Sequence, residues 1–422
     1  MTPSGLLAPA AGEGQISVDE ARRAIAAALQ PVTEVERVAL RHALGRVLAR
    51  DVISPIDVPA HDNSAMDGFA FAGNALRSGS ATTLRVAGTL FAGAPFGGRV
   101  GVGECLRIMT GAVMPEGLDT VVPLESCRTE GEQVHIEPGT IAAGENRRRR
   151  GEDLAAGRPA LHAGRVLRPV DLGLVASLGI AEVSVMRRLR VALFSTGDEL
   201  RTLGQPLAPG CVYDSNRFSL MAAVERLGME VIDLGLVRDE PAALQAALHA
   251  AMAQADVVLT SGGVSAGDAD YTRGLLERLG EVTFWKVAMR PGRPFAFGPL
   301  HTAATPRWLF ALPGNPVAAL VTFYAFVRDG LLQLAGAAAD PLPLLQARCT
   351  QPIRKRPGRT EFQRARLVPA ATGGWEVELA GAQGSGILSS MSQANALVVL
   401  HHEQGAVAAG QAVDVWLFDG LV

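Results

Sequence analysis

Apolar runs alternate with helical patterns in the second half of the chain, from about residue 190 to residue 334. The apolar runs at 191–195, 230–234, 256–260, 283–287 and 308–312 predict strands, and the segments 215–227, 241–253, 271–279 and 317–334 predict helices. Because strands that alternate with helices form right-handed βαβ units, we expect a doubly wound, mostly parallel sheet. Ligands of such sheets bind beyond the carboxyl ends of the strands, so the loops there are the first candidate sites.

The remaining segments have other patterns. Ser17 and Glu20 form a capping box in front of a helix over 17–29, and 37–49 is typical of a second helix. Short β-rich runs separated by glycines predict a mainly β domain between about 55 and 138; they are 84–87, 104–108, 120–123 and 133–136. Residues 144–181 return to helix and loop and are expected to pair with the N-terminal helices as one discontinuous unit. Residues 1–14 are expected to be a loose tail, and 344–422 a small β domain or barrel.

One segment has the length of a membrane span. Residues 308–327 carry no formal charge over 20 positions. However, the sequence from Pro313 to Pro316 interrupts this run, so we expect a buried strand, a turn and a buried helix. The N-terminus has no basic segment followed by an apolar one. We therefore expect neither a signal peptide nor an association with a membrane.

Composition narrows the function classes. Hydrophobic residues make up 48% of the 422, charged residues 19%, and the net charge is −3, which does not favour a nucleic-acid binder. Four scattered cysteines without a CxxC motif predict neither a zinc ribbon nor a disulfide scaffold, consistent with the cytoplasm. Of the 39 basic residues only Lys286 and Lys355 are lysine, so each lysine is a position to inspect.

The strongest local motif follows the predicted strand 256–260. Ser261, Gly262 and Gly263 begin the sequence SGGVSAGD, and a helix follows. Glycines let backbone N–H groups approach an anion, and a helix N-terminus adds partial positive charge, so the motif suits a phosphate or nucleotide with Asp268 and Asp270 near a metal. An ordinary strand-to-helix turn with an aspartate cap explains the same residues.

Two further loops at strand ends carry carboxylates. STGDE at 195–199 ends one strand, and Asp214 begins the next helix. Glu199 and Asp214 would then hold Mg²⁺ through their oxygens while phosphates complete its coordination. The alternative is that Asp214 caps its helix and Glu199 is solvated.

Three cations lie close together in the sequence at Lys286, Arg290 and Arg293, which suits an oxyanion, although a charged strand edge has the same composition. A compact ammonium differs from a planar guanidinium, so Lys286 is expected to matter specifically, whereas arginine is expected to serve equally well at Lys355. Pro313 and Gly314 form a rigid elbow before a helix. The basic runs at 147–150 and 354–359 suit either a solvated face or a polyanionic small molecule.

Taken together, these motifs resemble the molybdopterin molybdenumtransferases, the MoeA and gephyrin E-domain family. The matching sequences are NSAMDG at 63–68, MTGA at 109–112, RRRGED at 148–153, STGDEL at 195–200, TSGGVSAGDADYT at 260–272, PGRPFAFG at 291–298, LPGNPV at 312–317 and RPGRTEF at 356–362. Each is weak alone, but their joint occurrence in the family's order over residues 17–400 is specific.

The resemblance implies a set of functional residues. The family's carboxylates fall on Asp67, Asp153, Glu199, Asp239 and Asp270, and its threonine falls on Thr110. Its paired lysines fall on Lys286 and Arg290, so the second is replaced here. Further binding positions fall on Arg148, Ser261, Gly262, Gly263, Ser265, Pro313, Gly314, Arg359 and Ser385. Glu199, Asp67 and Asp214 are the candidate metal ligands.

The resemblance also implies a reaction, namely Mg²⁺-dependent insertion of molybdate into adenylylated molybdopterin with release of AMP. It implies a homodimer in which Asp67 and Thr110 complete the partner's site, with molybdopterin adenylyltransferase and molybdoenzymes as further partners. Two alternatives are an adenylyltransferase, which has a similar α/β domain, and a non-catalytic scaffold. A preference for tungstate is compatible with the same residues.

The implied architecture is a multidomain α/β protein. Residues 1–55 and 146–186 form a discontinuous linker domain, 56–145 a β-rich domain, 187–337 a doubly wound α/β domain of the molybdopterin-binding type, and 338–422 a β-barrel-like domain.

Overall fold

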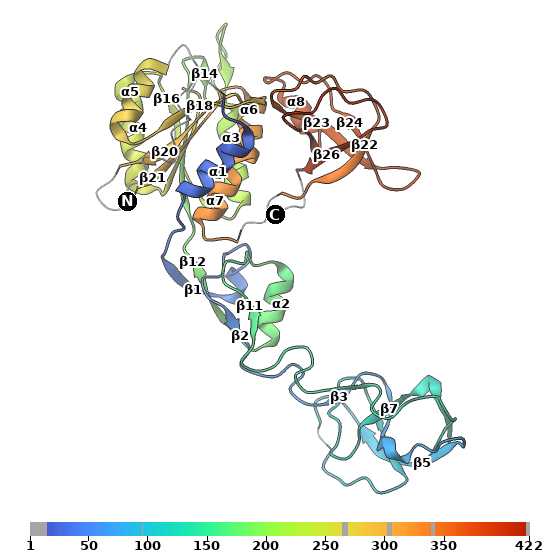
Figure 1. Cartoon of the computed structure of the whole chain (residues 1–422). Helices are drawn as coiled ribbons and strands as arrows, with labels where there is room; N and C mark the ends of the chain where they lie inside the picture. The colour runs from blue at the N-terminus through green and yellow to red at the C-terminus, as the bar shows by residue number, and fades with distance from the viewer. Residues whose placement is uncertain (1–14, 95, 264–268, 302–305, 339–341, 419–422) are drawn as a thin grey trace.

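The computed structural model describes residues 15–94, 96–263, 269–301, 306–338 and 342–418, with only the backbone given at 269–273. The tail predicted at 1–14 therefore lies outside the described residues. Figure 1 shows an elongated molecule with a β-rich domain at one end. An α/β domain and a barrel lie side by side at the other end, and a slender connecting domain separates the two ends.

The α/β domain is built on a six-stranded sheet of order β16-β13-β17-β21-β20-β18. The strands are β13 (Arg190–Thr196), β16 (Glu230–Val237), β17 (Val257–Ser261), β18 (Thr283–Lys286), β20 (Pro294–Leu300) and β21 (Arg307–Leu312). β16, β13, β17 and β21 run parallel to one another. β20 is antiparallel to both of its neighbours, so β18 again runs in the direction of β21.

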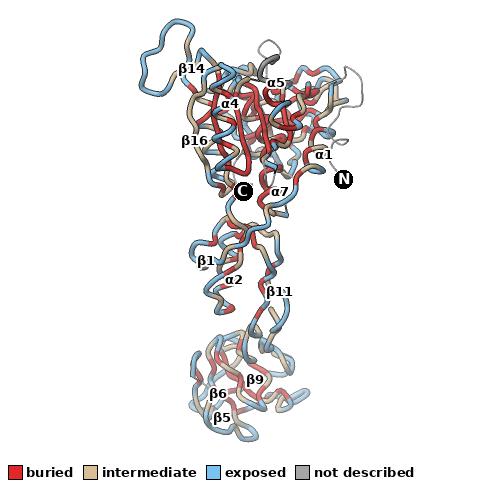
Figure 2. The backbone as a smooth tube through the Cα atoms, turned by 90° about the vertical axis from the view of Figure 1, so that its left-hand side faces the viewer, coloured by how far each residue is buried: buried red, intermediate tan, exposed pale blue. Residues whose placement is uncertain are grey.

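Helices cover both faces of this sheet, which confirms the doubly wound prediction. The helices are α3 (Ser215–Arg226), α4 (Pro241–Gln254), α5 (Ala269–Leu279), α6 (Pro316–Thr322) and α7 (Arg328–Leu334). Side chains alternate along each strand, so Leu193 joins the core cluster that includes α3, α6 and α7. Its neighbours Ala192 and Phe194 join the cluster that includes α4 and α5. Buried residues accordingly gather along this sheet in Figure 2.

The apolar segment near residue 320 belongs to the core. α6, the π-helical η4 (Phe323–Val327) and α7 form a continuous helix over Pro316–Leu334 with a mean hydropathy of 1.4. This helix has the length and composition of a membrane span, but 78% of its most apolar window is buried inside the fold. The predicted succession of buried strand, turn and buried helix is confirmed.

The connecting domain differs from its prediction. The helix predicted over 37–49 is wrong, because β1 (Val35–Ala39) occupies its start and pairs antiparallel with β12 (Glu182–Met186). β2 (Val52–Ile53) pairs with β11 (Pro159–Leu161), and α2 (Pro169–Ser177) packs beside them. Valines at positions 35 and 38 favour a strand once a partner strand is present. That partner lies about 150 residues along the chain, where a local pattern cannot reveal it.

The N-terminal helix α1 (Val18–Ala28) has the predicted capping box, since the Glu20 amide donates to Ser17 Oγ and the Ser17 amide to Glu20 Oε2. Although residues 1–55 are predicted to form part of the linker domain, α1 packs elsewhere. Its buried residues Val18, Ala21 and Ile25 join the core of the α/β domain, against η4 and α7.

The β-rich domain contains a six-stranded sheet of order β7-β4-β6-β5-β9-β8. The strands are β4 (Gly68–Phe71), β5 (Thr82–Leu90), β6 (Glu104–Ile108), β7 (Thr120–Pro123), β8 (Arg128–Glu130) and β9 (Gln133–Ile136). All four β runs predicted in this segment are strands. A short pair, β3 (Asn63–Ser64) with β10 (Arg147–Arg148), joins the ends of the segment.

The C-terminal domain is a closed barrel. Its strands are β22 (Leu345–Cys349), β23 (Thr360–Pro369), β24 (Trp375–Leu379), β25 (Ala396–Leu400) and β26 (Ala412–Leu417), with α8 (Leu388–Gln393) beside them. The barrel closes because β23 pairs with both β24 and β25. β19 (Met289–Arg290), which comes from the α/β segment, also pairs with β23, so one ladder joins the two domains.

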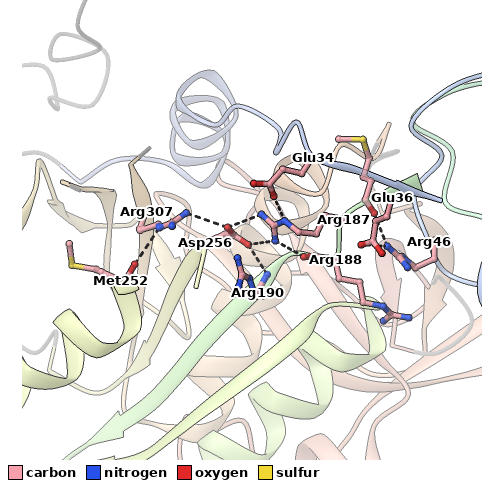
Figure 3. Close-up of polar contacts among 10 residues, drawn as sticks. Glu34, Glu36, Arg46, Arg187, Arg188, Arg190, Met252, Asp256 and Arg307 are labelled. Carbon is pink, nitrogen blue, oxygen red and sulfur yellow. Dashed lines mark hydrogen bonds and ion pairs between the residues drawn. The ribbon is translucent and has the colours of Figure 1, made fainter. Parts of the chain in front are cut away.

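A charged network joins the connecting domain to the α/β domain (Figure 3). Arg187 follows β12 and makes a bidentate contact with Asp256 at 2.9 and 3.1 Å, and its Nε donates to Glu34. Asp256 is 7% exposed and also accepts from the Arg190 amide at 2.9 Å and from Arg307 at 3.4 Å. Burial alone raises the pKa of Asp256, but its hydrogen bonds, above all those from Arg187, hold that pKa below the usual value.

Candidate functional site

Two loops meet at the carboxyl ends of β17 and β21. The amide group of Asn216, in the first turn of α3, connects them: Nδ2 donates to Ser261 Oγ at 2.7 Å and to the Gly314 carbonyl at 2.7 Å. Ser261 Oγ in turn donates to the Pro313 carbonyl at 3.4 Å. One buried side chain therefore fixes the SGG loop against the Pro-Gly elbow, which brings together three of the predicted binding residues, Ser261, Pro313 and Gly314.

The SGG loop requires glycine for two reasons. Gly262 has φ +97°, and a Cβ built on it would lie 2.2 Å from the Thr196 carbonyl oxygen, which any side chain would clash with. Gly263 has φ +71°. Ser265 and Asp268 lie outside the described residues. Asp270 lies in the first turn of α5, where the backbone alone is described.

Polar atoms near this loop remain available. Thr196 Oγ1 and Asn216 Oδ1 are buried and have no hydrogen-bond partner in the part of the chain that the structure describes. Buried polar atoms usually have partners, and those that lack one often face a ligand, an ion or ordered water. Both atoms belong to residues at the ligand edge of the sheet, which agrees with the expected site.

Asp214 has the capping role that its alternative interpretation predicts. It is 1% exposed and accepts from the Arg217 amide at 3.2 Å, Arg217 Nε at 3.0 Å and Ser195 Oγ at 3.0 Å. Both carboxylate oxygens are engaged by donors, and the predicted role of Asp214 as a metal ligand stays a prediction. No group of three or more His, Cys, Asp or Glu side chains suited to a metal occurs among the described residues.

Glu199 remains as a carboxylate at the end of β13. It is exposed, and its oxygen folds back over the Gly197 backbone, 2.7 Å from where a Cβ would stand. Asp239 is half-buried just after β16, at the same edge of the sheet. Magnesium is usually held by one or two protein carboxylates together with substrate phosphates and water, so these residues fit Mg²⁺ shared with a substrate.

Cations border the same region. Lys286 is exposed at the carboxyl end of β18, which runs parallel to β21 and ends at the same edge. Arg290 lies on β19 and points into an open cavity of about 670 Å³ whose other cationic lining residues are Arg354, Lys355, Arg356 and Arg359. Arg359 pairs with the buried Glu361 through Nε at 2.9 Å and a terminal nitrogen at 2.8 Å.

The barrel reaches the elbow through Ser385. The Val317 amide, in the first turn of α6, donates to the Ser385 carbonyl at 3.0 Å. Ser385 therefore lies beside the Pro-Gly elbow, and its role in binding stays a prediction. The structure thus gathers Glu199, the SGG loop, the elbow and Ser385 at one end of the molecule, with the arginine-lined cavity beside them.

A second group of predicted residues lies at the opposite end (Figure 1). Asp67 Oδ1 accepts from the Thr110 amide and from Thr110 Oγ1, both at 2.7 Å, and the backbone bond is the main cause of the lowered pKa of Asp67. Arg148 on β10 and Asp153 are exposed where this domain meets the connecting domain. Within one chain this group lies at the other end of the molecule from the SGG loop (Figure 1).

Two residues at the first end were not predicted. Asn216 carried a signal, because a polar side chain in the first turn after a strand faces the ligand edge. Lys355 was assigned no binding role, and the expectation that arginine would serve there stays a prediction. It is 7% exposed, and its Nζ lies 2.6 Å from the Gln404 carbonyl and 3.3 Å from each of the Arg356 and His402 carbonyls.

Three family models match the chain in succession. They are the MoeA N-terminal region (domain I and II) over residues 16–179, a probable molybdopterin binding domain over 192–333, and the MoeA C-terminal region (domain IV) over 346–418.

Individual relatives agree. The chain is 44% identical to a molybdopterin molybdenumtransferase of Haemophilus influenzae, with 96% of this chain and 100% of that protein covered. It is 39% identical to one of a Nostoc species, with 90% and 88% covered. A crystal structure of the molybdopterin biosynthesis moeA protein of Pyrococcus horikoshii is similar with a TM-score of 0.82 and 27% identity, over 96% of this chain and all of that one.

Proposed function

Because this chain belongs to the MoeA family of molybdopterin molybdenumtransferases, enzymes of molybdenum cofactor biosynthesis, we propose that it inserts molybdate into adenylylated molybdopterin and releases AMP. The observation that carries the proposal is the meeting of three kinds of anion-binding group at one end of the molecule. These are the SGG backbone, Lys286, and the cavity lined by four arginines. Both proposed substrates are anions, so bringing them together requires such groups.

Each group suits a different part of the substrates. The SGG loop and the Asn216 amide suit the nucleotide portion, because backbone donors and helix N-termini bind phosphates. Lys286 and Arg290 suit molybdate, since Lys286 is exposed at the end of β18 and Arg290 lines the open cationic cavity. In this proposal the cations hold the two anions close enough to react.

Magnesium is proposed as the cofactor, with Glu199 as its main ligand. When bound, Mg²⁺ would neutralise charge on the pyrophosphate of the substrate. Glu199 and the half-buried Asp239 lie at the ends of neighbouring strands, so they can orient the phosphates through the ion. The engaged carboxylate of Asp214 instead positions Arg217 and the start of α3.

The distal residues imply a site shared between two chains. Asp67 and Thr110 form a preorganised pair at the far end of the molecule, away from the SGG loop of the same chain. We propose that a second copy of the chain brings this pair to the SGG loop of the first, and that the enzyme works in the cytoplasm as a homodimer.

The reaction is tested with purified protein, adenylylated molybdopterin, molybdate and Mg²⁺. We expect AMP release that requires both molybdate and Mg²⁺. Transfer of AMP from ATP to molybdopterin without molybdate would instead identify an adenylyltransferase. A folded Glu199→Ala variant that inserts molybdenum at the full rate would support a non-catalytic scaffold. Replacing molybdate by tungstate in the same assay measures the preference for the metal oxyanion.

The shared site is tested by mixing two inactive variants, Asp67→Ala and Glu199→Ala. In a mixed dimer one of the two sites would contain both native residues. If sites are shared, random subunit exchange should restore about a quarter of the wild-type activity. If each site uses residues of one chain only, the mixture stays inactive. Native mass spectrometry of the mixture serves as the exchange control, because it detects the mixed dimers directly.

A further inference from the structure

Lys355 is a buried lysine within an exposed basic loop. Its neighbours Arg354 and Arg356 are exposed, whereas Lys355 is 7% exposed and extends inward. Its ammonium contacts the carbonyls of Arg356, His402 and Gln404 at 3.3, 3.3 and 2.6 Å. The charge is therefore satisfied by backbone oxygens, and no carboxylate lies within ion-pair distance of it among the residues described.

The three carbonyls explain why this position is lysine. An ammonium carries three donors arranged around one nitrogen, so it can donate to three oxygens that converge on a point. A guanidinium spreads its donors in a plane and is larger, so it does not fit the same set of acceptors. This chain has only two lysines among its 39 basic residues. The need to donate to three converging carbonyls explains why one of the two, Lys355, is not arginine.

These contacts join two segments of the barrel. Lys355 connects the loop of residues 354–359 to the turn at 401–404, and the Gly358 amide reinforces the junction by donating to the His402 carbonyl at 2.9 Å. The same loop carries Arg354, Arg356 and Arg359 along the wall of the open cavity that Arg290 also lines. The shape of that wall depends on where the loop is held.

The cavity is strongly cationic. Four arginines line it against a single carboxylate, Glu361, which already pairs with Arg359. Burial lowers the pKa of Lys355, and Glu361 opposes that change. Arginines that converge without matching carboxylates repel one another, so a loop carrying them needs a mechanical anchor as well as an anionic ligand.

We propose that Lys355 is a positioning residue for oxyanion binding: by anchoring the 354–359 loop it holds Arg354 and Arg356, together with Arg359 and Arg290, around a tetrahedral oxyanion of the molybdate class. This inference rests on the proposed function for the identity of the anion. It assigns no reacting role to Lys355, whose ammonium faces backbone carbonyls and acts through the arginines.

The test measures molybdate binding by titration calorimetry with the full-length protein and sodium molybdate alone. Lys355→Met and Lys355→Arg should both raise the Kd about tenfold or more, since neither side chain can donate to three converging carbonyls. Arg348→Met provides the matched control, because Arg348 is exposed on β22 of the same barrel and does not line the cavity. Its Kd should stay within about twofold of the wild type.

Kinetics separate positioning from general destabilisation. In the insertion assay the Lys355 variants should raise KM for molybdate while kcat at saturating molybdate changes little. Thermal unfolding shows whether each variant is folded at the assay temperature. A folded Lys355→Met variant with the wild-type Kd for molybdate would overturn the proposal.

A second pair of variants keeps the proposal testable if the Lys355 variants do not fold. Arg354→Ala and Arg356→Ala remove exposed side chains and are expected to fold, yet each should weaken molybdate binding several-fold. Wild-type affinity in both would also overturn the proposal. The two proposals can also fail separately. If molybdate binding depends on Lys355 but the wild type releases no AMP when molybdate is added, the proposed function is refuted while the positioning role stands.

Discussion

The contact between Arg187 and Asp256 allows a quantitative prediction about how the connecting domain is held to the α/β domain. Asp256→Asn keeps the shape of the side chain but removes its charge, leaving Arg187 and Arg307 without their buried partner (Figure 3). The Asp256 side chain is 8% exposed and that of Arg187 is 22% exposed. Breaking a buried ion pair by removing one partner destabilises by about 3–5 kcal/mol, and the partial exposure of Arg187 reduces our expectation to about 2–3 kcal/mol.

The assay is urea unfolding followed by tryptophan fluorescence, since Trp285 and Trp308 are buried in the α/β domain. Glu182→Gln provides the control in the same region. This substitution removes the ion pair between Glu182 on β12 and Arg37 on β1. The Arg37 side chain is 73% exposed and that of Glu182 is 52% exposed, so the free energy of unfolding should change by less than about 1 kcal/mol. Equal effects of the two substitutions would refute the view that burial makes the Asp256 network the stronger connection.

The same pair predicts a pH dependence with a defined sign. The pKa of Asp256 is lowered in the folded state, so its contribution is fully present above the unfolded pKa of about 3.9. It is lost as the pH falls through the lower, folded pKa. The stability difference between the wild type and Asp256→Asn should therefore be constant from pH 7 to about pH 5 and shrink below about pH 4. A difference that persists unchanged at pH 3 would contradict this assignment.

Three further predictions concern the ligand edge of the sheet. Asn216→Ala should lower kcat/KM for AMP release about tenfold or more, with a modest loss in melting temperature, because both loops lose their common donor. Gly262→Ala should abolish activity in a folded protein, as judged by circular dichroism, since its Cβ would overlap the Thr196 carbonyl. Lys286→Arg should impair insertion at limiting molybdate, whereas Arg290→Lys should be tolerated; equal activity of wild type and Lys286→Arg would show that the compact ammonium is unnecessary.

Local patterns were sufficient for most of the architecture. The alternation of apolar runs and helical segments predicted β13, β16, β17 and β21 with their helices, because strands buried on both faces are continuously apolar. The capping box of α1 was predicted from Ser17 and Glu20 alone. Such features depend on neighbours within a few residues, so a short segment of the sequence is enough to predict them.

Features that depend on distant partners were not predicted correctly. The segment 35–39 is a strand because β12 pairs with it, and the antiparallel β20 was not predicted at all. Asn216 connects residues that lie 45 and 98 positions away in the chain. Lys355 was judged from its basic neighbours, whereas the structure shows that the acceptors of its ammonium include the turn at 401–404. In each case the missing fact is a contact between separate segments.

The placement of the predicted residues determines what the connecting domain must do. Asp67 and Thr110 are joined by two hydrogen bonds at one end of the molecule, and Asn216 joins the SGG loop to the Pro-Gly elbow at the other. If the halves of two chains form one site, their relative position depends on the domain between them. The Asp256 network is one of the contacts that join this domain to the α/β domain, and Arg188 adds another by donating to the Gly228 carbonyl. Asp256 is buried at that junction and accepts several hydrogen bonds, which suits a connection that must hold its position. A flexible connection would let the two halves of the proposed shared site spend less time together.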